Sequence, residues 1–261
     1  MSTITAMGAR TELERERRFF FKMAIAMALV IVAGFSFNAA TGRSTFAAPL
    51  LVHVHAFTFF GWVALYLMQA GLVATGNVRL HRKMGILALL WVPAMTGLGI
   101  AMTVHSLRTT GGPFFFDQNE FLFGNSLGMV AFAAIVAWAL IVRQRSDWHR
   151  RLMTCAMACM TGPGFGRLLP MPFLIPWGWW IASVAVPSIF ILIGAVADKR
   201  RSGRVHPAWA WGFAFLLASQ LLADLVAYSG FGLSLTQDVI AGTPGATREM
   251  TAFLPPEFLA P

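Results

Sequence analysis

The sequence predicts an all-α membrane protein, a bundle of seven transmembrane helices with a cytoplasmic N-terminus and a periplasmic C-terminus. Three observations lead to this fold class: 57% of the 261 residues are hydrophobic, only 12% are charged, and basic residues gather at alternate connections between apolar runs. Soluble domains carry roughly a quarter of charged residues. A soluble globule is therefore excluded, and the apolar runs leave no room for a large domain outside the membrane.

Seven apolar runs follow one another along the chain, and each is long enough to cross a bilayer, which takes about 20 residues. We expect the polar residues 1–18 to form a cytoplasmic lead-in and residues 19–231 to form the transmembrane domain. The predicted spans are 19–40, 50–75, 84–106, 124–143, 151–172, 174–197 and 208–231. Residues 232–261, which contain Thr-Pro-Gly and Pro-Pro elements, are predicted to be a periplasmic tail without helical periodicity.

Several spans have features that distinguish them from simple apolar helices. The first is too long for the core of a signal peptide and lacks a convincing cleavage site after it, so we interpret it as a retained span. Pro93 and Pro187 predict kinks in the third and sixth. Residues 161–167 of the fifth contain three glycines and a proline. A helix loosened in this way survives in lipid when protein shields it or when it lines a cavity.

The charge distribution sets the predicted orientation. A net charge of +9 would suggest nucleic acid as a partner of a soluble protein. Here most of the basic residues adjoin apolar spans in four clusters, which places these ends in the cytoplasm, beside anionic lipid headgroups. We therefore expect a bacterial inner-membrane protein whose partner is the lipid bilayer, with no role for nucleic acid. The clusters are Arg10 to Lys22, Arg79 to Lys83, Arg143 to Arg151 and Lys199 to Arg204.

Polar and aromatic residues of the second span recur at helical spacing and form one stripe. This stripe contains His55, Thr58, Trp62, Tyr66 and Gln69. Residues three and four apart lie on the same face of a helix, so we expect the stripe to face the interior of the bundle. An interfacial histidine can also simply bind water or a carbonyl oxygen, and this alternative stays open.

Two charged residues lie within predicted spans, where an unpaired charge is costly. At a rise of about 1.5 Å per residue, Arg167 and Asp224 each lie about 24 Å from the basic ends of their spans. This common depth is compatible with a buried ion pair that serves either packing or function. Gln220 precedes Asp224 by one turn and gives the seventh span a polar face. We therefore predict a polar site that opens toward the outer face and is lined by His55, Tyr66, Arg167, Gln220 and Asp224.

Two short strings precede the third and fifth spans and form a weak internal repeat: Leu80-His81-Arg82-Lys83-Met84 and Trp148-His149-Arg150-Arg151-Leu152. A proline follows each string, Pro93 and Pro163 respectively. Together with the Gly-Pro-x-x-x-Arg element that ends at Arg167, these strings resemble those of uncharacterised bacterial multi-span inner-membrane proteins. The resemblance covers most of the second to fifth spans and implies no particular activity.

The distribution of histidines at two membrane depths is similar to the layout of transmembrane b-type cytochromes. That resemblance implies haem b as a cofactor, with His55 and His105 as axial ligands. The histidines at the basic ends, His81, His149 and His206, lie at helix ends among arginines, unlike the ligands of those cytochromes.

Three functional hypotheses follow. The first is proton-coupled or anion transport, based on Arg167, Asp224 and the broken fifth helix. The second is electron transfer by a haem-binding protein. The third is a non-catalytic accessory subunit with a membrane-complex partner, and a homo-oligomer is also compatible with the sequence. No catalytic motif identifies an enzyme.

Overall fold

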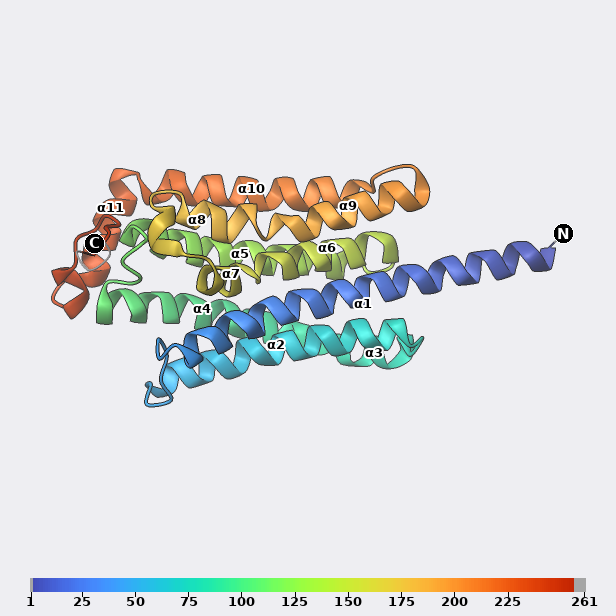
Figure 1. The fold of residues 1–261 in the computed structure, drawn as a ribbon, viewed down its shortest axis with the longest axis horizontal. Coiled ribbons are helices and arrows are strands. Elements are labelled where there is room, and N and C mark those ends of the chain that lie inside the picture. Colours follow the sequence, from blue (N-terminus) through green and yellow to red (C-terminus); the bar gives the residue numbers. More distant parts are fainter. Residues whose placement is uncertain (1, 256–261) are drawn as a thin grey trace.

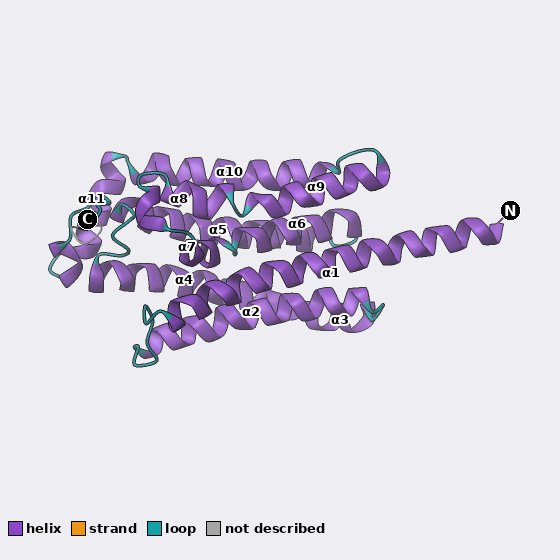
Figure 2. Ribbon diagram, in the orientation of Figure 1, coloured by secondary structure: helices purple, strands orange, loops and turns teal. Residues whose placement is uncertain are grey.

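The computed structural model describes residues 2–255, and these residues form helices and connecting segments without a strand (Figure 2). In chain order the elements are α1 (Ser2–Ala40), α2 (Leu50–Ala74), α3 (Val78–Met84), η1 (Gly85–Leu87), α4 (Ala88–Thr110), α5 (Gln118–Ile141), α6 (Ser146–Cys159), α7 (Gly162–Leu168), η2 (Met171–Leu174), α8 (Gly178–Trp180), η3 (Ile181–Ala185), α9 (Ser188–Ser202), α10 (Pro207–Ala227), α11 (Gly230–Ile240) and η4 (Pro244–Thr247).

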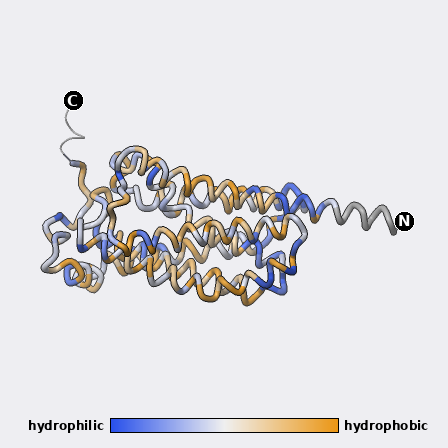
Figure 3. The backbone as a smooth tube through the Cα atoms, turned by 90° about the horizontal axis from the view of Figure 1, so that it is seen from below, coloured by the Kyte–Doolittle hydropathy of each residue, from blue (hydrophilic) through white to orange (hydrophobic). Residues whose placement is uncertain are grey.

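Six long apolar helices make this chain a polytopic membrane protein by length and composition. They are Thr11–Ala40, Leu50–Ala74, Val78–Thr110, Gln118–Ile141, Gly178–Ser202 and Pro207–Ala227. Large apolar side chains such as Leu90, Ile141 and Leu225 are exposed on their surfaces, as expected where lipid rather than water surrounds a helix. Figure 3 shows hydrophobic residues along the bundle and hydrophilic residues gathered toward its ends.

The fifth predicted span, 151–172, is not one long helix. The chain forms α6 and then the short α7, and the helix is interrupted at Met160 and Thr161. Pro163 has no backbone N–H to donate to the carbonyl of Cys159 four residues earlier. At the break, the carbonyl of Ala158 accepts from both the backbone N–H of Thr161 at 3.0 Å and its hydroxyl at 2.6 Å. The described residues thus confirm six long apolar helices, and the predicted count of seven is not confirmed, because the fifth span is an interrupted element.

The two terminal segments also differ from the prediction. Helix α1 runs without interruption from Ser2, so no break separates residues 1–18 from the first span. The predicted tail is not irregular throughout, because Gly230–Ile240 forms α11, whose first turn is capped by Ser229. The amide of Gln118 then donates to the carbonyl of Gly245 at 3.1 Å, which attaches the tail to the bundle. Residues 256–261 of the predicted tail lie outside the described residues.

The bundle has two chemically different ends. Residues 2 and 255 lie near opposite ends of its long axis (Figure 1). We call the end that carries Glu16, Arg151 and Asp198 the basic end, and the opposite end, which carries α11, the α11 end. The core between them is apolar and includes the fully buried side chains of Met27, Met95, Phe132, Ile135, Leu152 and Trp209.

A buried network of charged side chains holds the basic end together. Arg151 binds the carboxylate of Asp198 with two nitrogens, each at 2.7 Å, and the two residues are only 5% and 3% exposed. Trp209 donates to the same carboxylate at 2.8 Å, and Glu16 accepts from Arg151 at 3.2 Å. Paired and hydrogen-bonded charges are the form in which burial of charge is tolerated. The network thereby joins α1, α6, α9 and α10.

A second polar contact at this end joins the start of α6 to the start of α10. Asp147 and His206 are 2.9 Å apart. Burial opposes the charge on Asp147, but the hydrogen bond with His206, together with backbone N–H groups at the start of α6, lowers the pKa of this carboxyl below its usual value.

Two glycines allow α1 and α7 to cross in close contact. A Cβ atom on Gly34 would lie 2.3 Å from the carbonyl oxygen of Gly164, and a Cβ on Gly164 would lie 2.9 Å from the carbonyl oxygen of Val30. Close approach of backbones through small residues is a common way to pack helices in membranes. The crossing fixes α7 against α1 and so places the side chains of α7.

We expect Arg151→Leu to lower the free energy of unfolding by about 3–5 kcal/mol, because it leaves the buried Asp198 without its cation. The measurement is thermal or denaturant unfolding in detergent micelles. Arg200→Leu removes an exposed cation of α9 and serves as the control. An equal effect of the two substitutions would contradict the structural role of the network.

We expect Gly164→Ala to destabilise the protein by about 1–3 kcal/mol, because the added methyl group collides with the backbone of α1. Gly128→Ala is the matched control, since a Cβ at Gly128 meets no atom within 4 Å, and alanine is otherwise favoured over glycine in a helix. Unfolding midpoints of both variants test this, and a stabilised Gly164→Ala would show that the crossing is not tight.

Candidate functional site

A cavity of about 1100 Å³ lies in the half of the bundle toward the α11 end. Its wall comes from α1, α2, α4, α5, α9 and α10, together with α7, η3 and the connections between them. The break between α6 and α7 opens directly onto it, because Met160, Gly162 and Pro163 are wall residues. The volume slightly exceeds the usual range of small-molecule pockets, roughly 300–1000 Å³.

The wall is mostly apolar and aromatic, and the side chains in it that carry a full charge are basic. Arg43 and Arg167 contribute to it, whereas none of its described residues is an aspartate or a glutamate. A wall with this composition can hold an apolar body and one or more negative groups. Its large apolar residues include Phe35, Phe59, Phe60, Phe121, Met95, Met129 and Phe213.

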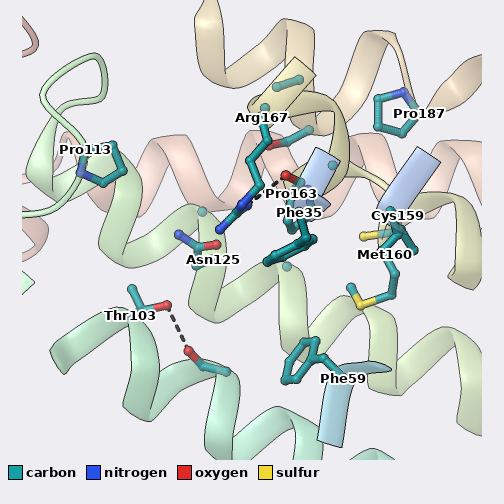
Figure 4. A pocket seen from close by; sticks show the side chains of 18 of the residues that line it. Phe35, Phe59, Thr103, Pro113, Asn125, Cys159, Met160, Pro163, Arg167 and Pro187 are labelled. Atoms are coloured by element: carbon teal, nitrogen blue, oxygen red, sulfur yellow. Dashed lines mark hydrogen bonds between the residues drawn. The ribbon is translucent and has the colours of Figure 1, made fainter. Parts of the chain in front are cut away.

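Arg167 is the central polar residue of the cavity. Its guanidinium lies 3.9 Å from the ring centre of Phe35, and one terminal nitrogen donates to the carbonyl of Pro163 at 2.8 Å. The Nε atom is buried and has no hydrogen-bond partner among the described residues. Figure 4 shows the side chain extending from α7 toward Asn125 of α5. The guanidinium therefore reaches into the cavity without an acidic partner.

Two residues of α2 add further unpaired nitrogens to the wall. His55 stacks on Phe59, with ring centres 4.1 Å apart, and its Nδ1 is buried without a partner among the described residues. Trp62 is only 3% exposed, and its indole nitrogen likewise lacks an acceptor there. Buried polar atoms are normally hydrogen-bonded. The unpaired nitrogens of Arg167 and Trp62 carry N–H groups and therefore indicate a missing ligand with acceptor atoms, whereas the unpaired Nδ1 of His55 donates or accepts according to the tautomer of the ring.

The predicted ion pair between Arg167 and Asp224 is not formed. Asp224 instead accepts from Gln220 at 2.7 Å and from the indole of Trp180 at 2.8 Å. The prediction failed because it measured depth along one continuous helix from Arg151, whereas the helix is interrupted at Met160 and Thr161 and Arg167 belongs to the separate helix α7.

The other predicted site residues are only partly brought together. His55, Arg167 and Gln220 line the cavity, and Asp224 lies behind Gln220, outside the wall. Tyr66 lies instead beside Thr154 in the core.

The histidines predicted to bind haem do not meet in the cavity, because His105 is not one of its wall residues. The histidines that do lie near each other are His81 and His149, with ring centres 6.3 Å apart. These belong to the two strings of the internal repeat, so the repeat brings equivalent positions together at the basic end. His149 Nδ1 lies 2.8 Å from the carbonyl oxygen of Ala139. The described residues contain no group of three or more potential metal ligands.

Sequence reasoning missed several residues that shape the site. Phe35 carries no polar signal, and its position over Arg167 depends on the crossing of α1 with α7. Asn125 is a single amide within an apolar run, so the sequence alone could have indicated it as a site residue. Trp62 was assigned to an interior-facing stripe, but its unpaired nitrogen is visible only in the packed structure.

Comparison with known proteins adds no assignment: no family model, curated protein or solved structure matches the chain.

We expect Trp62→Phe to leave the unfolding midpoint nearly unchanged, because the N–H group that is removed makes no hydrogen bond with the described residues. Trp91→Phe is the matched control, since the Trp91 indole donates to the carbonyl of Thr58 at 2.8 Å; its loss should cost about 0.5–1.5 kcal/mol. Thermal unfolding of the ligand-free protein in micelles compares the two. A larger loss in Trp62→Phe would mean that its nitrogen is already satisfied within the protein.

Proposed function

We propose that this membrane protein binds an amphipathic anion in the cavity and transports it. The observation that carries the proposal is the Arg167 guanidinium, which lies on the wall of a large aromatic cavity without a carboxylate to neutralise it. An uncompensated charge in a membrane protein is expensive and usually marks a functional site. A carboxylate or phosphate head group would supply the missing charge.

The remainder of the wall supports an apolar body for this ligand. Phenylalanine and methionine side chains surround the space, and burial of apolar ligand surface there is favourable. Trp62 offers a further N–H to an acceptor atom of the ligand, and the His55 ring offers one more polar atom on the same wall. A small inorganic anion would bind only the arginine of this wall, and a neutral lipid would contact only its apolar side chains. An amphipathic anion contacts both.

Transport rather than storage is supported by the interrupted element α6–α7. Substrate sites of transporters are commonly built from broken helices near the middle of the membrane, and here the break contributes Arg167 and Pro163 to the wall. We place the basic end in the cytoplasm of a bacterial inner membrane, on the ground that basic residues favour that side. In this orientation the cavity lies in the outer half.

The haem-binding alternative has less support, since only His55 of its two proposed ligands lies on the cavity wall. The accessory-subunit alternative gives no reason for the unpaired nitrogens in the wall.

We expect Arg167→Gln to weaken binding of a long-chain fatty acid about ten- to a hundredfold, because a hydrogen bond to a charged group contributes about 1.5–3 kcal/mol. Binding is measured with a fluorescent fatty acid, its phosphate-monoester analogue and the uncharged alcohol, and uptake of the same probes into proteoliposomes tests transport.

Arg108→Gln removes an exposed arginine outside the cavity and should bind normally. Arg167→Lys keeps the charge and should retain part of the affinity. Equal affinity for the alcohol and the acid, or an unaffected Arg167→Gln variant with normal unfolding, would contradict the proposal.

A further inference from the structure

A second hollow, which we call the α1–α9 groove, lies at the basic end between α1 and α9. It has a volume of about 350 Å³ and lies where hydrophilic residues gather (Figure 3). Residues three and four positions apart share one face of a helix, and the wall follows this spacing on both helices. Helix α1 contributes Glu12, Arg15 and Phe19, and α9 contributes Ala197, Arg200 and Arg201.

Two arginines of the groove have no partner in the protein. Arg15 of α1 and Arg200 of α9 are both exposed, and neither side chain forms a hydrogen bond or an ion pair with a described residue. Glu12 is the one acid among the described wall residues, and it forms no ion pair with them either. The two guanidinium groups therefore lie on opposite walls of the groove without a carboxylate to neutralise them.

The third arginine, Arg201, is held in place by the buried network of the basic end. Its Nη1 atom lies 3.1 Å from Oε1 of Glu16. The same carboxylate also pairs with Arg150 at 2.9 Å and with Arg151 at 3.2 Å. Asp198 is the second acid of this network, and it binds Arg151. Three arginines thus share two carboxylates, so the network leaves an excess of positive charge beside the groove.

The groove lies at the boundary between the apolar surface of the bundle and its basic end. The Arg201 guanidinium lies 5.3 Å from the ring centre of Phe19. On α9, Ile193 and Val196 precede the groove on the side toward the middle of the bundle, and both are exposed. Apolar side chains exposed in this way contact acyl chains, and the polar head groups of a bilayer begin where its hydrocarbon core ends. The groove is therefore at the level of the lipid phosphates.

We propose that the α1–α9 groove binds the phosphodiester head group of an anionic phospholipid. Among the described residues its wall carries three guanidinium groups and one carboxylate, and guanidinium groups bind phosphate oxygens with paired hydrogen bonds. Basic pockets between transmembrane helices are a recognised kind of head-group site. A zwitterionic phospholipid brings a cation of its own, so the excess of positive charge favours an anionic one.

The occupant is a phospholipid rather than a free phosphate, because the groove adjoins exposed apolar surface. Acyl chains that lie along α9 cover Ile193 and Val196, and a free phosphate lacks this favourable apolar contact. No described residue lines both the groove and the cavity. The lipid site is therefore independent of the proposed transport, and Arg167→Gln should leave it unchanged.

The test is native mass spectrometry of the full chain in detergent micelles, which counts bound lipid molecules. The probes are phosphatidylglycerol, zwitterionic phosphatidylcholine, and glycerol 3-phosphate as a phosphate without acyl chains. The wild type should retain one phosphatidylglycerol more tightly than further copies and more tightly than phosphatidylcholine. Arg15→Gln and Arg200→Gln should each weaken this binding about fivefold, and together about twenty-five-fold, since a basic residue near a membrane surface contributes about 1 kcal/mol to the attraction of anionic lipid.

The matched control is the double variant Arg82→Gln and Lys83→Gln, which removes two exposed cations of the same end outside the groove. It should bind phosphatidylglycerol like the wild type. Equal weakening in the two double variants overturns the proposal, because the attraction would then be spread over the whole basic end. Equal retention of phosphatidylcholine, or displacement of the lipid by a comparable concentration of glycerol 3-phosphate, overturns it as well.

Unfolding midpoints in lipid-free micelles show whether the variants fold. Arg15→Gln and Arg200→Gln should fold normally, because neither side chain has a partner among the described residues. If their combination does not fold, the two single variants decide, and each must lose about fivefold in affinity for the proposal to stand.

Discussion

The bidentate ion pair between Arg151 and Asp198 is the contact on which the arrangement of the bundle depends. It lies among apolar helices, where two charges are tolerated only because every strong donor and acceptor finds a partner. Through Glu16 and Trp209 the same cluster reaches α1 and α10. The basic end is therefore fixed, so α6 begins in a defined position. Its interruption at Met160 and Thr161 then lies at a defined place along the bundle.

The cavity toward the α11 end differs from this ion-pair cluster, because some polar atoms in its wall have no hydrogen-bond partner among the described residues. The glycine contact between Gly34 and Gly164 positions α7, and α7 directs Arg167 into the cavity. Polar atoms on Arg167, His55 and Trp62 lack partners there. The cavity thus retains unsatisfied groups that a ligand can use.

The internal repeat shows which structural features a sequence pattern can predict and which it cannot. The two strings that contain His81 and His149 were recognised as similar, and the structure places these histidines near each other. Their common position at helix starts was predictable from the basic residues around them. Their proximity was not, because it depends on how the helices that carry them are arranged in the bundle, which no local spacing encodes.

The sequence alone determined that the chain is helical and membrane-embedded, since run length and hydropathy are local properties that a bilayer selects directly. It also indicated a weak point in the fifth span, because proline and glycine act on their own backbone, although the interruption lies at Met160 and Thr161 and residues 162–168 form α7. Only the tertiary structure decided the partners of the charged residues. Arg167 and Asp224 share a predicted depth and yet do not pair, because Arg167 lies against Phe35 and the carbonyl of Pro163 while Asp224 accepts from Gln220 and Trp180.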